Sequence, residues 1–290
     1  MVSKHADLEG PVHYLDFGGD GPPLVCVHGL AGSALNWIAA APELARHYRV
    51  LAPDLRGFGR TPLGPGSRLR DNERLLDLFL RHVAGSPATL VGNSMGGLLS
   101  VRQAAKHPDT VQALVLVDPA LPYRRSRRFD LPVYASAAVL LMPIVGERLV
   151  TRRARRWGPE RLVRAALVLT CADPDRVPAE VVRAHVDEET VRLLSPRSQR
   201  ALAQAARSLL RELFRGADVR TYQRVQAPVL IVHGDQDRLV PLDISLAIGQ
   251  RCGWQVEVMP GVGHVPMLEA PEDFARVALG WLETQQPAAA

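Results

Sequence analysis

Residues 92–97 read Gly-Asn-Ser-Met-Gly-Gly, and they separate a short apolar run at 88–91 from a run with helical character. A strand, a tight turn with glycines two positions before and two after Ser94, and a helix together are typical of a nucleophile elbow. Such a turn holds the serine in a strained backbone conformation, so that its hydroxyl stands exposed at the carboxyl end of the sheet. We expect Gly92 and Gly96 to be glycine because strand and helix come too close there for a Cβ atom.

Expected strands and helices alternate on both sides of this turn. The expected strands lie at 12–17, 24–27, 48–52, 88–91, 112–117, 228–232 and 255–259. The expected helices lie at 34–47, 72–83, 98–105, 242–251 and 272–281. Because such alternation specifies a mostly parallel sheet with helices on both faces, the sequence predicts an α/β fold.

The alternation stops between residues 121 and 225, where no clear strand is visible and prolines and glycines interrupt the helical patterns. The segment 119–224 is also distinct in composition, because it holds 21 arginines, no lysine and 11 acidic residues. We therefore predict a helical lid, or cap domain, at 119–225, inserted into a core formed by 1–118 and 226–290.

The whole chain has a net charge of +5, and the excess of basic residues lies in this predicted lid. A basic lid favours contact with an anionic membrane surface or with an acidic substrate, and the plainer alternative is a solvated arginine-rich face. Nucleic-acid binding is not expected, because neither aromatic interleaving nor a recognisable binding motif is visible. The sequence leaves the oligomeric state open.

The composition, with 47% hydrophobic and 22% charged residues, is that of an ordinary soluble globular protein. The first residues contain no apolar stretch of a secretory signal, and no uncharged apolar run reaches the roughly 18–20 residues that a membrane span needs. Cys26, Cys171 and Cys252 are odd in number and widely spaced, which does not suit a disulfide framework or a metal site. We expect a cytoplasmic protein with free thiols, no metal and no cofactor, and with peripheral membrane contact if the lid provides it.

Ser94 needs partners, because a serine hydroxyl is a poor nucleophile at neutral pH without a neighbouring base. Two loops that follow predicted strands offer them. The loop after the strand at 228–232 contains Asp237, and the loop after the strand at 255–259 contains His264. Loops beyond the carboxyl ends of parallel strands are where such sheets place their sites.

These features give the chain a resemblance, over nearly its full length, to capped, esterase- and lipase-like serine hydrolases of the α/β-hydrolase fold. The resemblance rests on five segments in the family's order: His28 to Ser33, Asp54 to Arg60, the Ser94 turn, Gly234 to Pro241, and Gly263-His264. It implies that Ser94 is the nucleophile, His264 the base and Asp237 the acid that orients the histidine. It also implies an oxyanion hole formed by the backbone N–H groups of Leu30 and Met95.

Two other acidic residues compete for the role of Asp237. Asp235 and Asp118 also follow predicted strands, and some relatives place the acid near the second of these positions. The spacing Gly-x-x-Asp-x-x-x-Pro at 234–241 favours Asp237, and it leaves Asp235 to brace the loop.

Other polar residues near these motifs are expected to be structural. His28 would hold the oxyanion loop, and His233 would be a satisfied histidine at the end of a buried strand. Arg56, in the turn that begins at Asp54, is expected to pair with a carboxylate.

The substrate pocket is expected to receive apolar side chains from both the core and the lid. The residues expected to line an acyl pocket are Trp37, Phe129, Tyr134, Met142 and Val265. For the lid residues among them, packing inside the lid is an equally good alternative.

The nucleophile narrows the reaction class. Because residue 94 is serine, the alkyl-enzyme chemistry of epoxide hydrolases and haloalkane dehalogenases, which use an aspartate there, is excluded. The sequence favours hydrolysis of carboxylic esters with apolar, acyl-chain substrates. The elbow also resembles that of carbon–carbon bond hydrolases of ring-cleavage products, but those relatives carry a tryptophan where this chain has Val265. A cofactor-free perhydrolase, an acyltransferase and a catalytically silent binding protein of the same fold are also compatible with the sequence.

Overall fold

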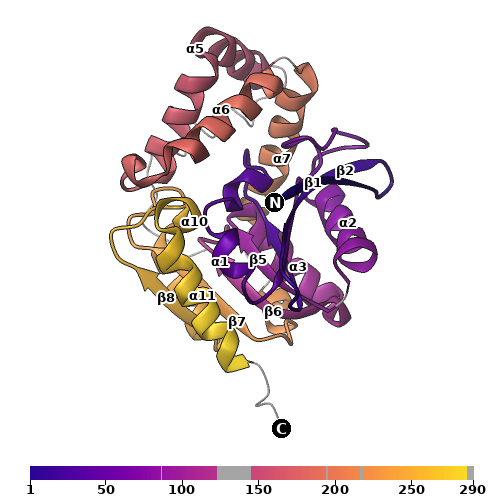
Figure 1. Ribbon diagram of the computed structural model, residues 1–290, viewed down its shortest axis with the longest axis vertical. Helices are drawn as coiled ribbons and strands as arrows, with labels where there is room; N and C mark the ends of the chain where they lie inside the picture. The colour runs from indigo at the N-terminus through magenta and orange to yellow at the C-terminus, as the bar shows by residue number, and fades with distance from the viewer. Residues whose placement is uncertain (86, 123–144, 194, 216–218, 286–290) are drawn as a thin grey trace.

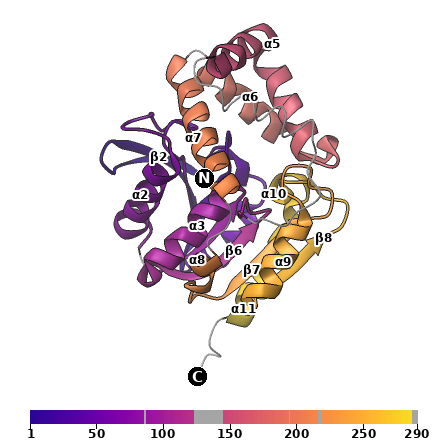
Figure 2. The same ribbon diagram turned by 180° about the vertical axis from the view of Figure 1, so that it is seen from behind.

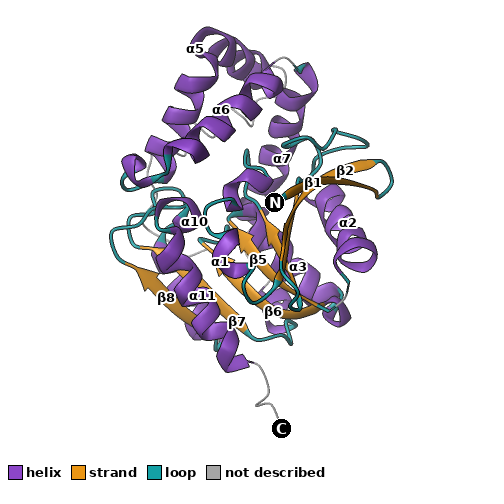
Figure 3. Ribbon diagram, viewed as in Figure 1, coloured by secondary structure: helices purple, strands orange, loops and turns teal. Residues whose placement is uncertain are grey.

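The computed structural model describes residues 1–85, 87–122, 145–193, 195–215 and 219–285. These residues form one eight-stranded sheet with helices on both faces, and a further group of helices lies beyond one end of the sheet (Figures 1 and 3). The predicted α/β fold is therefore confirmed.

The sheet is mostly parallel. Its strands are β1 (Val2–Asp7), β2 (Pro11–Gly18), β3 (Pro23–Val27), β4 (Arg49–Pro53), β5 (Ala88–Asn93), β6 (Val111–Val117), β7 (Val229–Gly234) and β8 (Gln255–Met259). They lie in the order β1-β2-β4-β3-β5-β6-β7-β8, and β2 runs antiparallel to both of its neighbours while the other pairs are parallel. The sequence does not predict β1, because this edge strand is mostly polar and exposed and so carries no apolar alternation.

Helices cover both faces of the sheet (Figures 1 and 2). One face is covered by α2 (Leu69–Phe79), α3 (Met95–Lys106) and α9 (Leu242–Cys252). The other face is covered by α1 (Ala41–Leu44) and α11 (Pro271–Gln285). Each layer buries its own apolar cluster, one containing Leu76 and Leu98 and the other containing Leu44 and Phe274. The carboxyl ends of the parallel strands therefore belong to a sheet that is packed on both faces.

The helix predicted at 34–47 is wrong in its length. The structure has two short elements there, η1 (Ala34–Trp37) and α1, with a turn between them. Pro42 lies in the first turn of α1. Because proline has no N–H to donate backwards, a helix can begin at this residue but cannot run through it. The remaining short elements of the core are η2 (Leu80–Ala84), η3 (Pro108–Thr110) and α10 (Pro266–Glu269).

Between β6 and β7, the residues that the structure describes form helices and no strand. These elements are α5 (Val145–Thr170), η4 (Pro174–Arg176), α6 (Ala179–Leu193), α7 (Pro196–Arg215) and α8 (Val219–Gln223). α5 is interrupted at Gly158, whose φ of 75° and ψ of 168° are not helical. α7 returns from this group toward the sheet and buries Ala205 and Leu209 in the same apolar cluster as α2 and α3. The behaviour of 119–225 as a separate lid stays a prediction.

Two further observations bear on the sequence-based expectations. Among the helices that the structure describes, none is both long and apolar enough to cross a membrane. Cys26, Cys171 and Cys252 are all free thiols.

Candidate active site

Ser94 lies in the turn between β5 and α3, with φ of 54° and ψ of −116°. A non-glycine residue in such a conformation costs on the order of 1–3 kcal/mol, so its surroundings must hold it there. Its N–H donates to the carbonyl oxygen of Val117 at 2.9 Å, and its carbonyl oxygen accepts from the N–H of Ala120 at 3.0 Å. The segment that ends β6 thus holds the turn on both sides, and Ser94 is left partly exposed.

Gly92 and Gly96 are glycine because backbone passes close to both of them. A Cβ atom on Gly96 would lie 2.2 Å from the carbonyl oxygen of Val27, and one on Gly92 would lie 2.6 Å from the carbonyl oxygen of Gly96. Both distances are far shorter than van der Waals contact, and backbone cannot move aside as a side chain can. The predicted close approach of strand and helix is confirmed.

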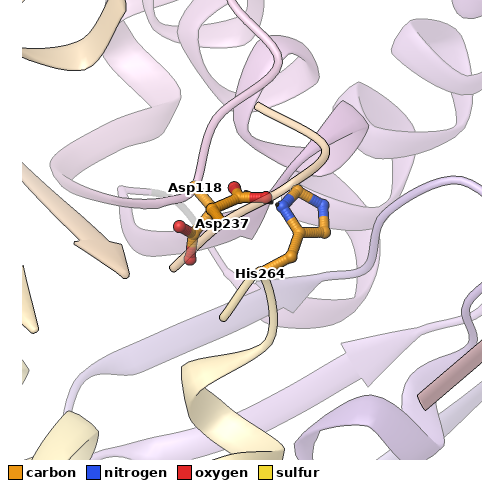
Figure 4. A group of neighbouring side chains, drawn as sticks. All are labelled: Asp118, Asp237 and His264. Carbon is orange, nitrogen blue, oxygen red and sulfur yellow. Dashed lines mark hydrogen bonds and ion pairs between the residues drawn. The ribbon is translucent and has the colours of Figure 1, made fainter. Parts of the chain in front are cut away.

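His264 and Asp237 form a hydrogen-bonded pair whose side chains are 5% and 0% exposed (Figure 4). Nδ1 of His264 lies 2.7 Å from Oδ2 of Asp237. The other carboxylate oxygen accepts from the N–H groups of Leu239 and Val240, at 2.7 Å and 3.1 Å. Burial acts to raise the pKa of Asp237, but the charge and hydrogen bond of His264 hold it below its usual value. Because an ionised carboxylate only accepts, the His264 proton sits on Nδ1, and Nε2 is the basic nitrogen.

Asn93, next to Ser94, ties the nucleophile turn to the loop of His264. Its Nδ2 donates to the carbonyl oxygen of His264 at 3.0 Å and to that of Val117 at 3.2 Å. Asn93 and His264 are 171 residues apart in the chain. The sequence of the elbow does not predict this contact, because nothing local to Asn93 indicates its partner.

The predicted oxyanion loop, 28–33, packs directly against Ser94. A Cβ atom on Gly29 would lie 3.0 Å from the Cβ of Ser94. Met95 is the first residue of α3, and the first N–H groups of a helix have no acceptor within that helix. Leu30 and Met95 therefore lie on neighbouring segments beside Ser94, and their role as oxyanion donors stays a prediction.

Asp118, the alternative acid, lies against Asp237 and does not replace it (Figure 4). Polar atoms of Asp118, Asp237 and His264 all lie within 4.8 Å of one another. Oδ1 of Asp118 accepts from the N–H of Gly234 at 2.9 Å, whereas its buried Oδ2 meets no N–H or hydroxyl donor among the described residues. Burial first, and then the neighbouring Asp237, raise the pKa of Asp118 well above its usual value. The arrangement fits a protonated Asp118 that offers its O–H to Asp237.

The same three side chains are close enough together to be considered as metal ligands. Nδ1 of His264 is already engaged with Asp237 at 2.7 Å, and the Asp118 carboxyl favours its protonated form. Because metal ligands must be deprotonated and must point at one ion, the geometry fits a hydrogen-bonded network better than a metal site.

Two further histidines lie near the candidate triad with their rings hydrogen-bonded to structural partners. Nδ1 of His28 lies 2.7 Å from the carbonyl oxygen of Gly29, and Nε2 accepts from the N–H of Leu55 at 3.0 Å. Burial lowers the pKa of His28 to about 4, so the ring is neutral at physiological pH. His233 lies 2.8 Å from the hydroxyl of Ser245. These contacts agree with structural roles for both residues.

The expectation that Arg56 pairs with a carboxylate is wrong. Its guanidinium is buried, and Nη2 donates to the carbonyl oxygen of Leu8 at 2.8 Å. Glu9 and Asp71 act on it through longer-range charge. The reason is that the turn after the unpredicted strand β1 brings the Leu8 carbonyl over the guanidinium. The carboxylate that organises this region is Asp54, which accepts from backbone N–H groups of two separate loops.

Of the five residues expected to line an acyl pocket, the structure describes two. Trp37 is fully buried and packs against Phe274, with ring centroids 6.4 Å apart. It is therefore a core residue and not part of an open pocket, because η1 turns this side chain inward against α11. Val265 is also buried, directly after His264. The three lid residues predicted for the pocket lie outside the residues that the structure describes: Phe129, Tyr134 and Met142.

The helical region between β6 and β7 is bonded directly to the loop of His264. The N–H of His264 donates to the carbonyl oxygen of Thr170, the last residue of α5, at 2.6 Å. The buried carboxylate of Glu269 accepts three backbone N–H bonds, from Gly263 at 2.8 Å, Ala172 at 3.1 Å and Asp173 at 2.7 Å. Sequence patterns give no signal for this junction, because its partners lie about a hundred residues apart in the chain.

Residues 24–277 match the alpha/beta hydrolase family, and the chain belongs to that family. Over 282 residues it is 30% identical to a 2-hydroxy-6-oxo-6-(2'-aminophenyl)hexa-2,4-dienoic acid hydrolase of Metapseudomonas resinovorans, covering 93% of this chain and 86% of that one. It is 28% identical to a 2-hydroxy-6-oxo-2,4-heptadienoate hydrolase of Pseudomonas putida, covering 92% and 91%. A solved serine hydrolase involved in carbazole degradation has a TM-score of 0.74 and 25% identity, covering 98% of this chain and 99% of that one. The resemblance to α/β-hydrolase fold proteins is confirmed, and the protein is a hydrolase of that fold.

Proposed function

We propose that Ser94, His264 and Asp237 act as nucleophile, base and acid in the hydrolysis of carboxylic esters with apolar acyl groups. The observation that supports this most directly is the buried 2.7 Å bond between His264 Nδ1 and Asp237 Oδ2. Asn93 joins the loop of that histidine to the strained turn of Ser94. A histidine oriented by a carboxylate, together with a partly exposed serine on a neighbouring loop, is what acyl transfer requires.

In the proposed reaction, Nε2 of His264 takes the proton of Ser94 Oγ as the oxygen attacks the ester carbonyl. The developing oxyanion accepts from the N–H groups of Leu30 and Met95, and each such donor contributes on the order of 3 kcal/mol. His264 then gives its proton to the leaving alcohol oxygen as the C–O bond breaks. Asp237 stabilises the charged imidazolium in both steps.

The second half of the reaction releases the acid. Water attacks the acyl carbon, and His264 takes a proton from it. That proton returns to Ser94 Oγ as the bond between serine and acyl group breaks. The proposal therefore needs no redox partner and no cofactor.

A second candidate function is hydrolysis of a carbon–carbon bond in an acidic ring-cleavage product. Two of the relatives described above are named for hydrolysis of a 2-hydroxy-6-oxo dienoic acid. A buried cation near the predicted oxyanion loop supports this candidate. Arg192 on α6 is 8% exposed, and its Nη1 donates to the carbonyl oxygen of Ala31 at 3.3 Å. Its buried Nε meets no acceptor among the described residues, although Glu189 offsets part of the charge at 3.1 Å.

A parallel assay of both substrate classes tests the proposal. Wild-type protein and Ser94→Ala would be given a series of p-nitrophenyl esters and a 2-hydroxy-6-oxo dienoate. We expect ester hydrolysis by the wild type and a loss of about 10³-fold or more in kcat for Ser94→Ala, because the nucleophile is removed. Equal ester hydrolysis by both proteins would contradict a role for Ser94.

A variant of Arg192 distinguishes between the two candidate functions. If the natural substrate is a dienoate, the wild type has a higher kcat/KM for the dienoate than for any ester. Arg192→Gln then lowers kcat/KM for the dienoate and leaves kcat/KM for neutral esters unchanged. The matched control is Arg183→Gln, an exposed arginine on the same helix. If neutral esters are the better substrates, Arg192→Gln and Arg183→Gln behave alike.

A further inference from the structure

A polar pocket of about 410 Å³ lies between α7 and the beginning of α2. α7 lies beside α2 in both views of the molecule (Figures 1 and 2). The residues lining the pocket are Arg68, Arg200, Gln204, Arg207, Ser208 and Arg211. None of the three proposed triad residues lines it, so this pocket is distinct from the candidate active site.

The pocket is built by one face of α7. The lining residues of this helix, at 200, 204, 207, 208 and 211, recur every three or four positions and therefore share a face. The opposite face is buried in the core. Oε1 of Gln204 accepts from the N–H of Ser67 at 3.2 Å, and the hydroxyl of Ser208 accepts from the N–H of Leu69 at 3.0 Å. These two bonds hold the arginine-bearing face in a fixed position against the start of α2.

The described lining of the pocket is strongly basic. Among the described residues it contains four guanidinium groups and no carboxylate. Asp71, close to its margin, accepts from the N–H of Arg68 at 3.0 Å and lies 3.6 Å from the guanidinium of Arg70. Glu212, also on α7, is paired with Arg102. The positive end of the α2 dipole lies at the same place, so the local field favours an anion.

We propose that this pocket binds a small anion carrying one or two phosphate groups, either as a free compound or as the headgroup of an anionic phospholipid. Guanidinium groups stay charged at physiological pH, and their paired N–H groups match phosphate oxygens in two-point contacts. Arg68, Arg200 and Arg211 together offer more donors than one carboxylate could use, which favours phosphate over a simple organic acid. The proposal goes beyond the hydrolytic site, because it does not depend on which bond Ser94 attacks.

Pyrophosphate binding to the full chain, measured by isothermal titration calorimetry at low salt, tests this pocket. The test variant is Arg200→Gln with Arg211→Gln. Both side chains are exposed, so we expect their replacement to leave the free energy of unfolding unchanged. The control is Arg197→Gln with Arg215→Gln, which removes the same charge from exposed positions of the same helix outside the pocket. We expect the test variant to weaken binding at least about tenfold, the effect of losing charged hydrogen bonds, and the control to change it less than about twofold.

Flotation with phosphatidylcholine vesicles, with and without phosphatidylglycerol, distinguishes the source of the phosphate. Binding of anionic vesicles that the test variant loses and the control keeps supports a lipid headgroup. Pyrophosphate binding without vesicle binding supports a free phosphate compound. Absence of both, or equal weakening by the two double variants, would overturn the proposal, because the charge would then act diffusely. An unchanged free energy of unfolding in both variants, measured by urea denaturation, serves to show that the fold is intact.

Discussion

Asp118 and Asp237 face each other in the interior, where two ionised carboxylates would repel strongly. A proton held by Asp118 removes this repulsion, and the resulting O–H supplies a donor to the carboxylate that orients His264. Burial and the neighbouring Asp237 both favour the protonated form of Asp118. We infer that Asp118 positions Asp237 and leaves its charge available to the histidine.

Replacing Asp118 gives a prediction with a definite dependence on pH. The folded protein holds a proton on Asp118 that the unfolded chain releases above about pH 4, so the wild type loses stability as pH rises. Asp118→Asn keeps a donor and does not titrate. Relative to the wild type, its free energy of unfolding, measured by urea denaturation, should therefore rise by on the order of 1.4 kcal/mol per pH unit from about pH 4 up to the raised pKa of Asp118 in the folded state, and should stay level above it.

Activity provides the second measurement on this residue. We expect kcat of Asp118→Asn to stay within a few-fold of the wild type, whereas Asp118→Ala, which lacks the donor, should lose considerably more. A stability difference between Asp118→Asn and wild type that does not change with pH would contradict the protonated carboxyl.

At the scale of single elements, the unit formed by β5, the Ser94 turn and α3 depends on close backbone contact. The helix can approach β3 because Gly96 presents no side chain to the carbonyl oxygen of Val27. The strained conformation of Ser94 is held by bonds to Val117 at the end of β6 and to Ala120. The position of Ser94 is thus set by packing among three elements.

Gly96→Ala should disrupt this unit. The added methyl group would stand 2.2 Å from the Val27 carbonyl oxygen, so α3 must move away from β3. We expect a loss of about 2–3 kcal/mol in the free energy of unfolding, measured by chemical denaturation, together with a loss of ester hydrolysis.

The control for that change is Gly280→Ala in α11, where a Cβ would meet no atom of another element within 4 Å. Alanine is the better helix former, so this variant should gain about 0.5–1 kcal/mol. If both variants shifted stability in the same direction, the close contact at Gly96 would not be what requires glycine.

At the scale of the whole molecule, the helical region and the sheet meet at the loop of His264. Thr170 at the end of α5 accepts from the backbone of His264, and Glu269 binds both sides of the junction through three N–H groups. A displacement of the helical region is therefore transmitted to the histidine loop.

Glu269→Ala should loosen this junction. Three N–H groups, of which that of Gly263 is buried, would lose their acceptor, so we expect faster hydrogen exchange at Ala172, Asp173 and Gly263 and a fall of about tenfold in kcat. Glu269→Gln keeps one acceptor oxygen and should recover part of both. The control is Glu272→Gln, an exposed acid on α11. An even rise of exchange over the entire sheet would show that Glu269 acts on global stability alone.

Local patterns in the sequence were sufficient to predict the α/β class, seven of the eight strands, and the loops that carry Ser94, Asp237 and His264. These features are local: apolar runs, turn residues and short motifs are legible within about ten residues of each position. The missed strand β1 and the divided helix at 34–47 show the limit of such signals. A polar edge strand carries no alternation, and one proline is enough to divide a helical pattern.

Which distant groups meet was set by the tertiary structure. It brought Asn93 to the backbone of His264, set Asp118 beside Asp237, and turned Trp37 into the core. The physical reason is that strand order and helix packing depend on the burial of the whole apolar surface, which no short segment encodes. The sequence therefore specified the candidate triad residues, and the packing of the sheet determined their neighbours.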